Sequence, residues 1–218
     1  AVVTPGDEII IPEPCFVAYK ACATFSGATP VIINLKAEYD FKLRPEALAK
    51  AITPRTKALI LQFPNNPTGA VMTREDLRQI VEVLKDKDIL VLSDEIYAEL
   101  TYGSKHVSIA SFPEMKEKTL VINGFSKAFA MTGWRLGYAC GHPDLIGAIY
   151  KIHQYGIMSS PTTAQYAAIE ALRNGDEDVE NMTREYNRRR RIMVDGFRKA
   201  GLDCFEPYGA FYTFQCIK

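Results

Sequence analysis

The sequence predicts an α/β fold in which a mostly parallel sheet lies between helices, followed by the start of a smaller α+β domain. Short apolar runs of strand length alternate along residues 1–140 with segments whose apolar residues recur at helical spacing. The run at residues 89–92 is almost continuously apolar, which is typical of a parallel strand buried on both faces. From residue 143 the pattern becomes mainly helical. We therefore expect a large domain over residues 1–175, and a connecting helix with the first part of a small domain over residues 176–218.

The individual elements follow from these periods and from the residues that interrupt them. Strands are predicted at residues 8–11, 31–35, 58–63, 89–92, 119–122, 136–140 and 211–217. Helices are predicted at residues 16–26, 43–52, 73–84, 145–153, 163–172 and 179–200, with a short helical or irregular piece at residues 107–112. Thr73 and Asp76 have the spacing of a capping box, which begins the third helix, and Gly201 ends the last one.

Composition excludes several classes of function. The chain has 218 residues, 47% of them apolar, and can bury a substantial core. Its 26 basic and 26 acidic residues balance, so no basic face for nucleic acid is expected, and the four arginines at residues 188–191 should fan around a solvated helix. The five cysteines are odd in number and lack CxxC spacing, which argues against a disulfide framework and a metal site. No apolar run approaches the roughly 20 residues of a membrane helix, and no signal peptide opens the sequence, so we expect a cytoplasmic protein without membrane contact.

Both ends of the sequence have features of a cut chain. It begins without Met in a loop-like stretch at residues 1–7, and it stops directly after the strand predicted at residues 211–217. We therefore expect a fragment of a longer protein.

The connection between the strands at residues 119–122 and 136–140 contains a candidate nucleophile. Lys127 lies among apolar residues such as Phe125 and Phe129, and partial loss of water favours the neutral, nucleophilic form of an amine. Such an amine can form a Schiff base with an aldehyde. The residues alone leave a second interpretation open, in which Lys127 extends along an apolar surface to reach water.

A carboxylate and a phenol follow the buried strand at residues 89–92. Ligands of an open α/β sheet bind in the crevice beyond the carboxyl ends of its strands, and Asp94 and Tyr97 are close enough in sequence to face one ligand there. Taken alone, Asp94 could equally cap a helix. We assign no chemistry to Glu95, which we expect to cap or to lie at the surface, or to His106, which we expect to be solvated.

Four stretches together resemble the class I and II aminotransferases, which are pyridoxal-phosphate enzymes of fold-type I. They are Pro-Glu-Pro-Cys-Phe at residues 12–16, Asn-Pro-Thr-Gly at residues 66–69, Asp-Glu-Ile-Tyr at residues 94–97, and Ser-Lys with Met-Thr-Gly-Trp-Arg-Leu-Gly within residues 126–137. The resemblance spans essentially the whole chain and is nearest to the aspartate and aromatic amino acid branch. It implies the large domain of that fold, incomplete at its N-terminus.

The resemblance implies that the cofactor is pyridoxal 5′-phosphate and that three residues are catalytic. Lys127 would hold the cofactor as an internal aldimine and then act as general base and acid. Asp94 would pair with the protonated ring nitrogen and keep the ring cationic, so that it accepts electrons. Tyr97 would donate a hydrogen bond to the phenolic oxygen, as would the non-catalytic Asn66.

The remaining cofactor ligands implied by the resemblance are Phe16, Ser126 and Arg135. Phe16 would stack on the ring, although its position alone is also explained by packing under a helix. Ser126 and Arg135 would bind the phosphate. The family pattern further predicts cis peptide bonds before Pro14 and Pro67.

The activity implied is transfer of an amino group between an amino acid and a 2-oxo acid, by a homodimer. Two alternatives remain. One is a carbon–sulfur lyase that uses the same Lys127 for elimination from cysteine-like substrates, and the other is a non-catalytic remnant or regulatory domain that keeps the fold for binding or dimerisation. The resemblance places the Gly-rich phosphate loop upstream of residue 1 and the arginine that binds the substrate carboxylate downstream of residue 218. The sequence therefore names no particular amino acid.

Overall fold

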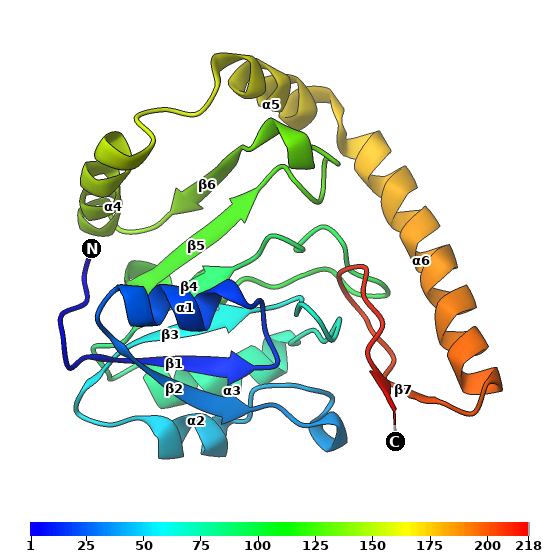
Figure 1. Cartoon of the computed structure of the whole chain (residues 1–218), viewed down its shortest axis with the longest axis horizontal. Helices are drawn as coiled ribbons and strands as arrows, with labels where there is room; N and C mark the ends of the chain where they lie inside the picture. Colours follow the sequence, from blue (N-terminus) through cyan, green and yellow to red (C-terminus); the bar gives the residue numbers. More distant parts are fainter. Residues whose placement is uncertain (218) are drawn as a thin grey trace.

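The computed structural model, which describes residues 1–217, contains a six-stranded sheet flanked by helices (Figure 1). The strand order is β2-β1-β3-β4-β5-β6, and the first five of these run parallel while β6 is antiparallel to β5. The strands are β1 (Glu8–Glu13), β2 (Thr29–Asn34), β3 (Thr56–Gln62), β4 (Leu90–Asp94), β5 (Thr119–Gly124) and β6 (Gly137–Cys140). This confirms the predicted α/β fold with a mostly parallel sheet.

Helices cover both faces of the sheet because its inner strands are apolar on both sides. In β1, Ile9 and Ile11 pack in the cluster beside α1 (Ala18–Phe25), whereas Ile10 belongs to the larger cluster on the opposite face. That larger cluster includes residues of α2 (Pro45–Ala51) and α3 (Arg74–Leu84). Successive side chains of a strand point to opposite faces, so one continuous apolar run serves two helical layers.

The start of α3 is the capping box that the sequence predicts. The Thr73 hydroxyl accepts from the backbone N–H of Asp76 at 3.2 Å, and the Asp76 carboxylate accepts from the N–H of Thr73 at 2.8 Å. At the other end, the Lys118 ammonium donates to three backbone carbonyls around the last turn. Both ends of the helix are therefore satisfied, and its apolar stripe is buried against the sheet.

Three further helices follow the sheet: α4 (Pro143–Gly156), α5 (Thr162–Asn174) and α6 (Asp176–Lys199). They run along β6 and then down the side of the sheet toward which β1 to β5 point (Figure 1). Single 3₁₀ turns occur at Ala37–Tyr39, Ile109–Ser111, Lys116–Lys118 and Thr132–Trp134. None of the helices within residues 1–217 is long and apolar enough to cross a membrane, and no cluster of three or more His, Cys, Asp or Glu side chains there could hold a metal ion.

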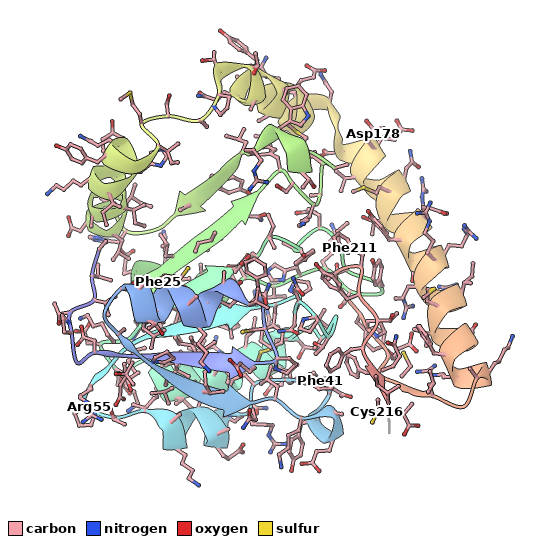
Figure 2. All side chains as sticks on the ribbon, in the orientation of Figure 1. Phe25, Phe41, Arg55, Asp178, Phe211 and Cys216 are labelled. Carbon is pink, nitrogen blue, oxygen red and sulfur yellow. The ribbon has the colours of Figure 1, made fainter. Side chains whose placement is uncertain are left out.

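The prediction of one strand over residues 211–217 is wrong. Only Gln215–Cys216 forms a strand, β8, which pairs with β7 (Asp203–Cys204). The residues before it form an irregular segment that lies between α6 and the carboxyl ends of the parallel strands, and Figure 2 labels Phe211 on it. Its backbone forms hydrogen bonds with loops and not with the edge of the sheet. The N–H of Tyr208 donates to the carbonyl of Gly69, and the N–H of Ala210 donates to the carbonyl of Leu100. We call residues 205–214 the return segment.

The four arginines of α6 do not all lie on a solvated face, which corrects our expectation for residues 188–191. Arg188 and Arg189 do pair with Glu185 at the surface. The side chain of Arg190, however, is only 12% exposed, and it binds the Glu206 carboxylate and the carbonyl oxygen of Pro207. Successive helical residues point in different directions, so one of the four faces the return segment and anchors it to α6.

The peptide bonds before Pro14 and Pro67 are cis, as predicted, and the bond before Pro64 is also cis. The loop that contains the last two approaches the return segment closely. A Cβ atom on Gly69 would lie 2.4 Å from the Cβ of Pro207, and one on Gly209 would lie 2.5 Å from the Cβ of Pro64. Glycine is therefore required at both positions for the two segments to touch.

We predict that Gly69→Ala destabilises the protein more than Gly103→Ala. Both glycines have positive φ, +74° and +97° respectively, so both variants carry a backbone penalty of about 1–2 kcal/mol. A Cβ at Gly103 meets open space, whereas a Cβ at Gly69 collides with Pro207 and adds about 1–3 kcal/mol. Urea unfolding of both variants measures the difference. Equal losses of stability would show that the return segment does not press on this loop.

Candidate active site

The predicted site residues follow the ends of β1, β3, β4 and β5. These strands are parallel, so their carboxyl ends share one edge of the sheet, the edge next to the return segment in Figure 1. A crevice at this edge is where an open α/β sheet binds its ligands. The site is therefore assembled by topology from loops that are far apart in sequence.

Asp94 ends β4 and has a partly buried carboxylate. One of its oxygens accepts a hydrogen bond from the Tyr19 hydroxyl, and the other accepts from the backbone N–H of Ile96 at 3.1 Å. Burial raises the pKa of Asp94 above its ordinary value, although these two hydrogen bonds act in the opposite direction. No lysine, arginine or histidine within residues 1–217 forms an ion pair with Asp94. The site thus contains a desolvated carboxylate whose charge the described residues do not balance.

Tyr97 is buried, with 3% of its surface exposed, and its hydroxyl lies 2.6 Å from the hydroxyl of Tyr212. Burial and this hydrogen bond raise the pKa of Tyr97, as does the nearby Asp94, whereas a hydrogen bond from the Asn66 side chain acts to lower it. Asn66, Asp94 and Tyr97 therefore lie close enough to influence one another.

Lys127 joins this group through the ring of Tyr97. Its Nζ lies 5.9 Å from the centroid of the Tyr97 ring and 5.6 Å from that of Phe211. Such positions over aromatic faces are those of a cation–π contact. The Lys127 amine and the Asp94 carboxylate are therefore both neighbours of Tyr97, the first through its ring and the second through its effect on the pKa of the hydroxyl.

Phe16 contacts residues that lie next to Asp94. Its backbone N–H donates to the Gln62 side chain at 3.4 Å, and its ring meets the ring of Tyr19 edge-on with centroids 5.7 Å apart. The Phe16 side chain is 44% exposed, so it is not a core residue packed under α1. Through Tyr19 it is linked to Asp94.

Ser126 and Arg135 lie in the lysine loop but contact other parts of it. The Thr132 hydroxyl donates to the carbonyl of Ser126 at 2.9 Å, and the Arg135 guanidinium donates to the carbonyl of Thr132 at 2.9 Å. Arg135 is exposed and has a positive φ of 53°. Among the hydrogen bonds of residues 1–217, neither side chain is joined to Asn66, Asp94 or Tyr97.

Sequence reasoning missed three residues that build the site: Tyr19, Asn65 and Tyr212. Buried Asn65 donates to the carbonyl of Pro14 at 3.1 Å and accepts from the Thr68 hydroxyl at 2.7 Å, so it ties the loop after β1 to the loop after β3. Tyr19 had a usable signal, because it lies one helical turn after Phe16 and so shares its face. Tyr212 is 115 residues from Tyr97 and offered none.

Glu95 and His106 are not at the surface, which corrects both expectations. Glu95 is 5% exposed and accepts hydrogen bonds from Ser93, Ser108 and the Nε2 of His106, the last at 2.9 Å. Burial acts to raise the pKa of Glu95, but the hydrogen bonds from His106 and Ser108 outweigh it and lower that pKa. This buried network fixes the turn that carries Asp94 and Tyr97.

Comparison with known proteins gives a consistent result. The family "Aminotransferase class I and II" matches residues 1–218. The Bacillus subtilis protein YugH, whose aminotransferase activity is attributed rather than established, is 52% identical over all of this chain. The aspartate aminotransferase of Geobacillus stearothermophilus is 45% identical over 96% of the chain. The chain spans 56% and 54% of these two relatives, a little over half of their length.

Solved structures agree with the sequence relatives. The aromatic aminotransferase of Pyrococcus horikoshii superposes with a TM-score of 0.96 at 40% identity, over 99% of this chain and 58% of that one. An aspartate aminotransferase of Thermus thermophilus, solved with maleate, gives a TM-score of 0.93 at 42% identity over 98% of this chain and 56% of that one. With this fold and these motifs, the chain belongs to the class I and II aminotransferases, a family of pyridoxal-phosphate-dependent enzymes of fold-type I.

Proposed function

We propose that the protein catalyses amino transfer between an amino acid and a 2-oxo acid, with pyridoxal phosphate bound covalently to Lys127. The observation that carries this proposal is the Asp94 carboxylate, which is desolvated and has no cation in the described residues, beside a phenol whose ring lies under the Lys127 amine. A charge in that state is costly unless a ligand pairs with it.

The chemistry of the side chains fits this cofactor. A carboxylate matches a protonated pyridine nitrogen, and the Tyr97 hydroxyl and the Asn66 amide match a phenolic oxygen. Phe16 offers an exposed aromatic face to a flat ring, and Ser126 and Arg135 offer a hydroxyl and a guanidinium to a phosphate. When bound, pyridoxal phosphate would supply an aldehyde for condensation with amines and a cationic ring that withdraws electrons.

Each residue then has a definite task. Asp94 would hold the proton on the ring nitrogen of the cofactor, and Tyr19 keeps the carboxylate oriented through its hydrogen bond. Lys127 would hold the cofactor covalently through Nζ. Once a substrate amine had displaced it, the free amine would act as base and acid and move a proton between the substrate Cα and the C4′ carbon of the cofactor. Its place beside the buried ring of Tyr97 limits access of water to that proton from one side.

We further propose that the protein acts as a homodimer and that its division into domains falls near residue 175. Helices α4 and α5 expose large apolar side chains, including Tyr150, Ile152 and Tyr155 on α4 and Tyr166 and Leu172 on α5. An apolar surface of this kind is typical of an interface between proteins. A second copy of the chain is the occupant that we infer.

We predict that Lys127 is the only lysine that becomes labelled when the protein is incubated with pyridoxal phosphate and reduced with borohydride. Reduction makes the bond between the cofactor and the amine permanent, and peptide mass spectrometry locates it. Lys127→Ala should abolish this label. The exposed Lys151→Ala, as the matched control, should leave it unchanged. A label on another lysine would exclude the proposed role of Lys127.

An amino acid added without an oxo acid then separates the three possible functions. An aminotransferase should release keto acid in an amount equal to the bound cofactor and stop. A carbon–sulfur lyase should release ammonia continuously from cysteine-like substrates. A non-catalytic protein should show no change in the visible spectrum.

We predict that Asp94→Asn stabilises the cofactor-free protein at pH 7. The folded-state pKa of Asp94 is raised, so its ionised form opposes folding above that pKa, and this cost disappears as the pH falls and the carboxyl is protonated. The advantage of the variant should therefore shrink on acidification. Urea unfolding between pH 4 and pH 8 measures it, with exposed Asp203→Asn as the control. A variant less stable than the parent at pH 7 would contradict the desolvation argument.

We predict that Ile152→Asp combined with Tyr155→Glu shifts the intact protein from dimer to monomer. Both side chains lie on α4 and are 59% and 89% exposed, and a charge on an apolar interface is costly to bury. Light scattering reports the mass. Ile192→Glu, at an exposed position of α6, should leave the mass unchanged. A parent protein that is monomeric throughout would end the proposal of a dimer.

A further inference from the structure

The return segment brings two aromatic side chains to the candidate site. The hydroxyl of Tyr212 lies 2.6 Å from that of Tyr97, and their rings meet edge-on with centroids 5.8 Å apart. Phe211 also packs edge-on against the Tyr97 ring, with centroids 5.3 Å apart, and its ring centroid lies 5.6 Å from the Lys127 Nζ. Figure 2 shows Phe211 on the return segment, between α6 and the loops of the sheet.

The position of Tyr212 is fixed by its neighbours in the chain. Ala210 is fully buried and has a φ of +56°, a conformation that costs a non-glycine residue about 1–2 kcal/mol and persists where its surroundings impose it. Here they do: its N–H donates to Leu100 at 2.8 Å, and its carbonyl accepts from the Tyr102 hydroxyl. The sharp turn at Ala210 directs the next two side chains to Tyr97 and Lys127.

The same segment is fastened to the loop that carries Asn66. The Gly69 carbonyl accepts from the N–H groups of Tyr208 and Gly209 at 3.0 and 2.9 Å. Two loops that supply cofactor ligands, one after β3 and one after β4, are therefore bonded to the segment that supplies Tyr212. This arrangement places the Tyr212 hydroxyl with high precision relative to Asn66 and Tyr97.

We propose that Tyr212 is a positioning residue that sets the direction of the Tyr97 hydroxyl toward the phenolic oxygen of the cofactor. This inference rests on the proposed function. A phenol has one proton to donate, and the nearby Asn66 side chain acts to lower the pKa of Tyr97. Without a cofactor, the two hydroxyls share one hydrogen bond in which either oxygen can be the donor. When Tyr97 donates to the cofactor, Tyr212 must donate to Tyr97, which strengthens the new hydrogen bond. Only a group that both donates and accepts can do this.

Tyr212→Phe tests the proposal because it removes the hydroxyl and keeps the ring that packs on Tyr97. The matched control is Tyr208→Phe, in the same segment, whose hydroxyl has no hydrogen bond within residues 1–217. The first readout needs no cofactor. In the full chain labelled with ¹³Cζ-tyrosine, Tyr97→Phe identifies the Tyr97 resonance. Tyr212→Phe should move that resonance and lower the pKa of Tyr97, since the hydrogen bond that raises it is lost. Tyr208→Phe should do neither.

The second readout is the visible absorbance of the protein loaded with pyridoxal phosphate, followed as a function of pH. Tyr97→Phe should change the pH at which half of the absorbance change has occurred, which we call the midpoint. Tyr212→Phe should shift this midpoint in the same direction by a smaller amount. The double variant should have the same midpoint as Tyr97→Phe alone. If Tyr212→Phe leaves both the Tyr97 resonance and this midpoint where they are in the parent, the positioning role is wrong.

The two proposals fail separately. Absence of borohydride label on Lys127 ends the proposed function whatever Tyr212 does. A labelled Lys127, with a midpoint that responds to Tyr97→Phe and not to Tyr212→Phe, ends the positioning role and leaves the proposed function standing.

Discussion

The desolvation of one carboxylate, Asp94, is the constraint around which this structure is arranged. The carboxylate is partly removed from water at the end of the central strand β4. Within the described part of the chain it accepts hydrogen bonds from the Tyr19 hydroxyl and the Ile96 N–H and pairs with no cation. Two neutral donors reduce the cost but do not cancel it. A fold keeps such a group where function needs it and recovers the stability elsewhere, here in the apolar clusters on both faces of the sheet.

Rigid links between loops hold the other groups at fixed distances from that carboxylate. Asn65 ties the loop after β1 to the loop after β3, and buried Glu95 ties the turn after β4 to His106 and Ser108. The return segment is hydrogen-bonded to the loop after β3 at Gly69 and to the loop after β4 at Leu100. Loops are ordinarily the mobile part of an α/β fold. At this edge of the sheet the loops are joined to one another by hydrogen bonds, and such fixed positions are needed for several polar groups to act on one ligand.

Local patterns predicted the sheet and the motif residues, because a buried parallel strand, a capping box and the family motifs are each written in a few consecutive residues. Residues whose role depends on distant partners could not be predicted in this way. Tyr212 meets Tyr97 from 115 positions away, and the apolar alternation before it suggested a strand because nothing local reveals the positive φ of Ala210. Glu95 and Arg190 look like surface charges in sequence and become buried only through partners supplied by other segments.

The anchor at Arg190 extends this coupling to α6. Its guanidinium binds Glu206 and Pro207 at the start of the return segment and lies 5.3 Å from the ring of Tyr102, the residue whose hydroxyl holds the Ala210 carbonyl. A displacement of α6 would therefore break these contacts or carry the return segment with it. Because Phe211 and Tyr212 follow Ala210 directly, either outcome would reach the Tyr97 hydroxyl and the surroundings of the Lys127 amine. The position of α6 and the geometry of the site are thus coupled through the return segment, although α4 and α5 separate Lys127 from α6 in the sequence.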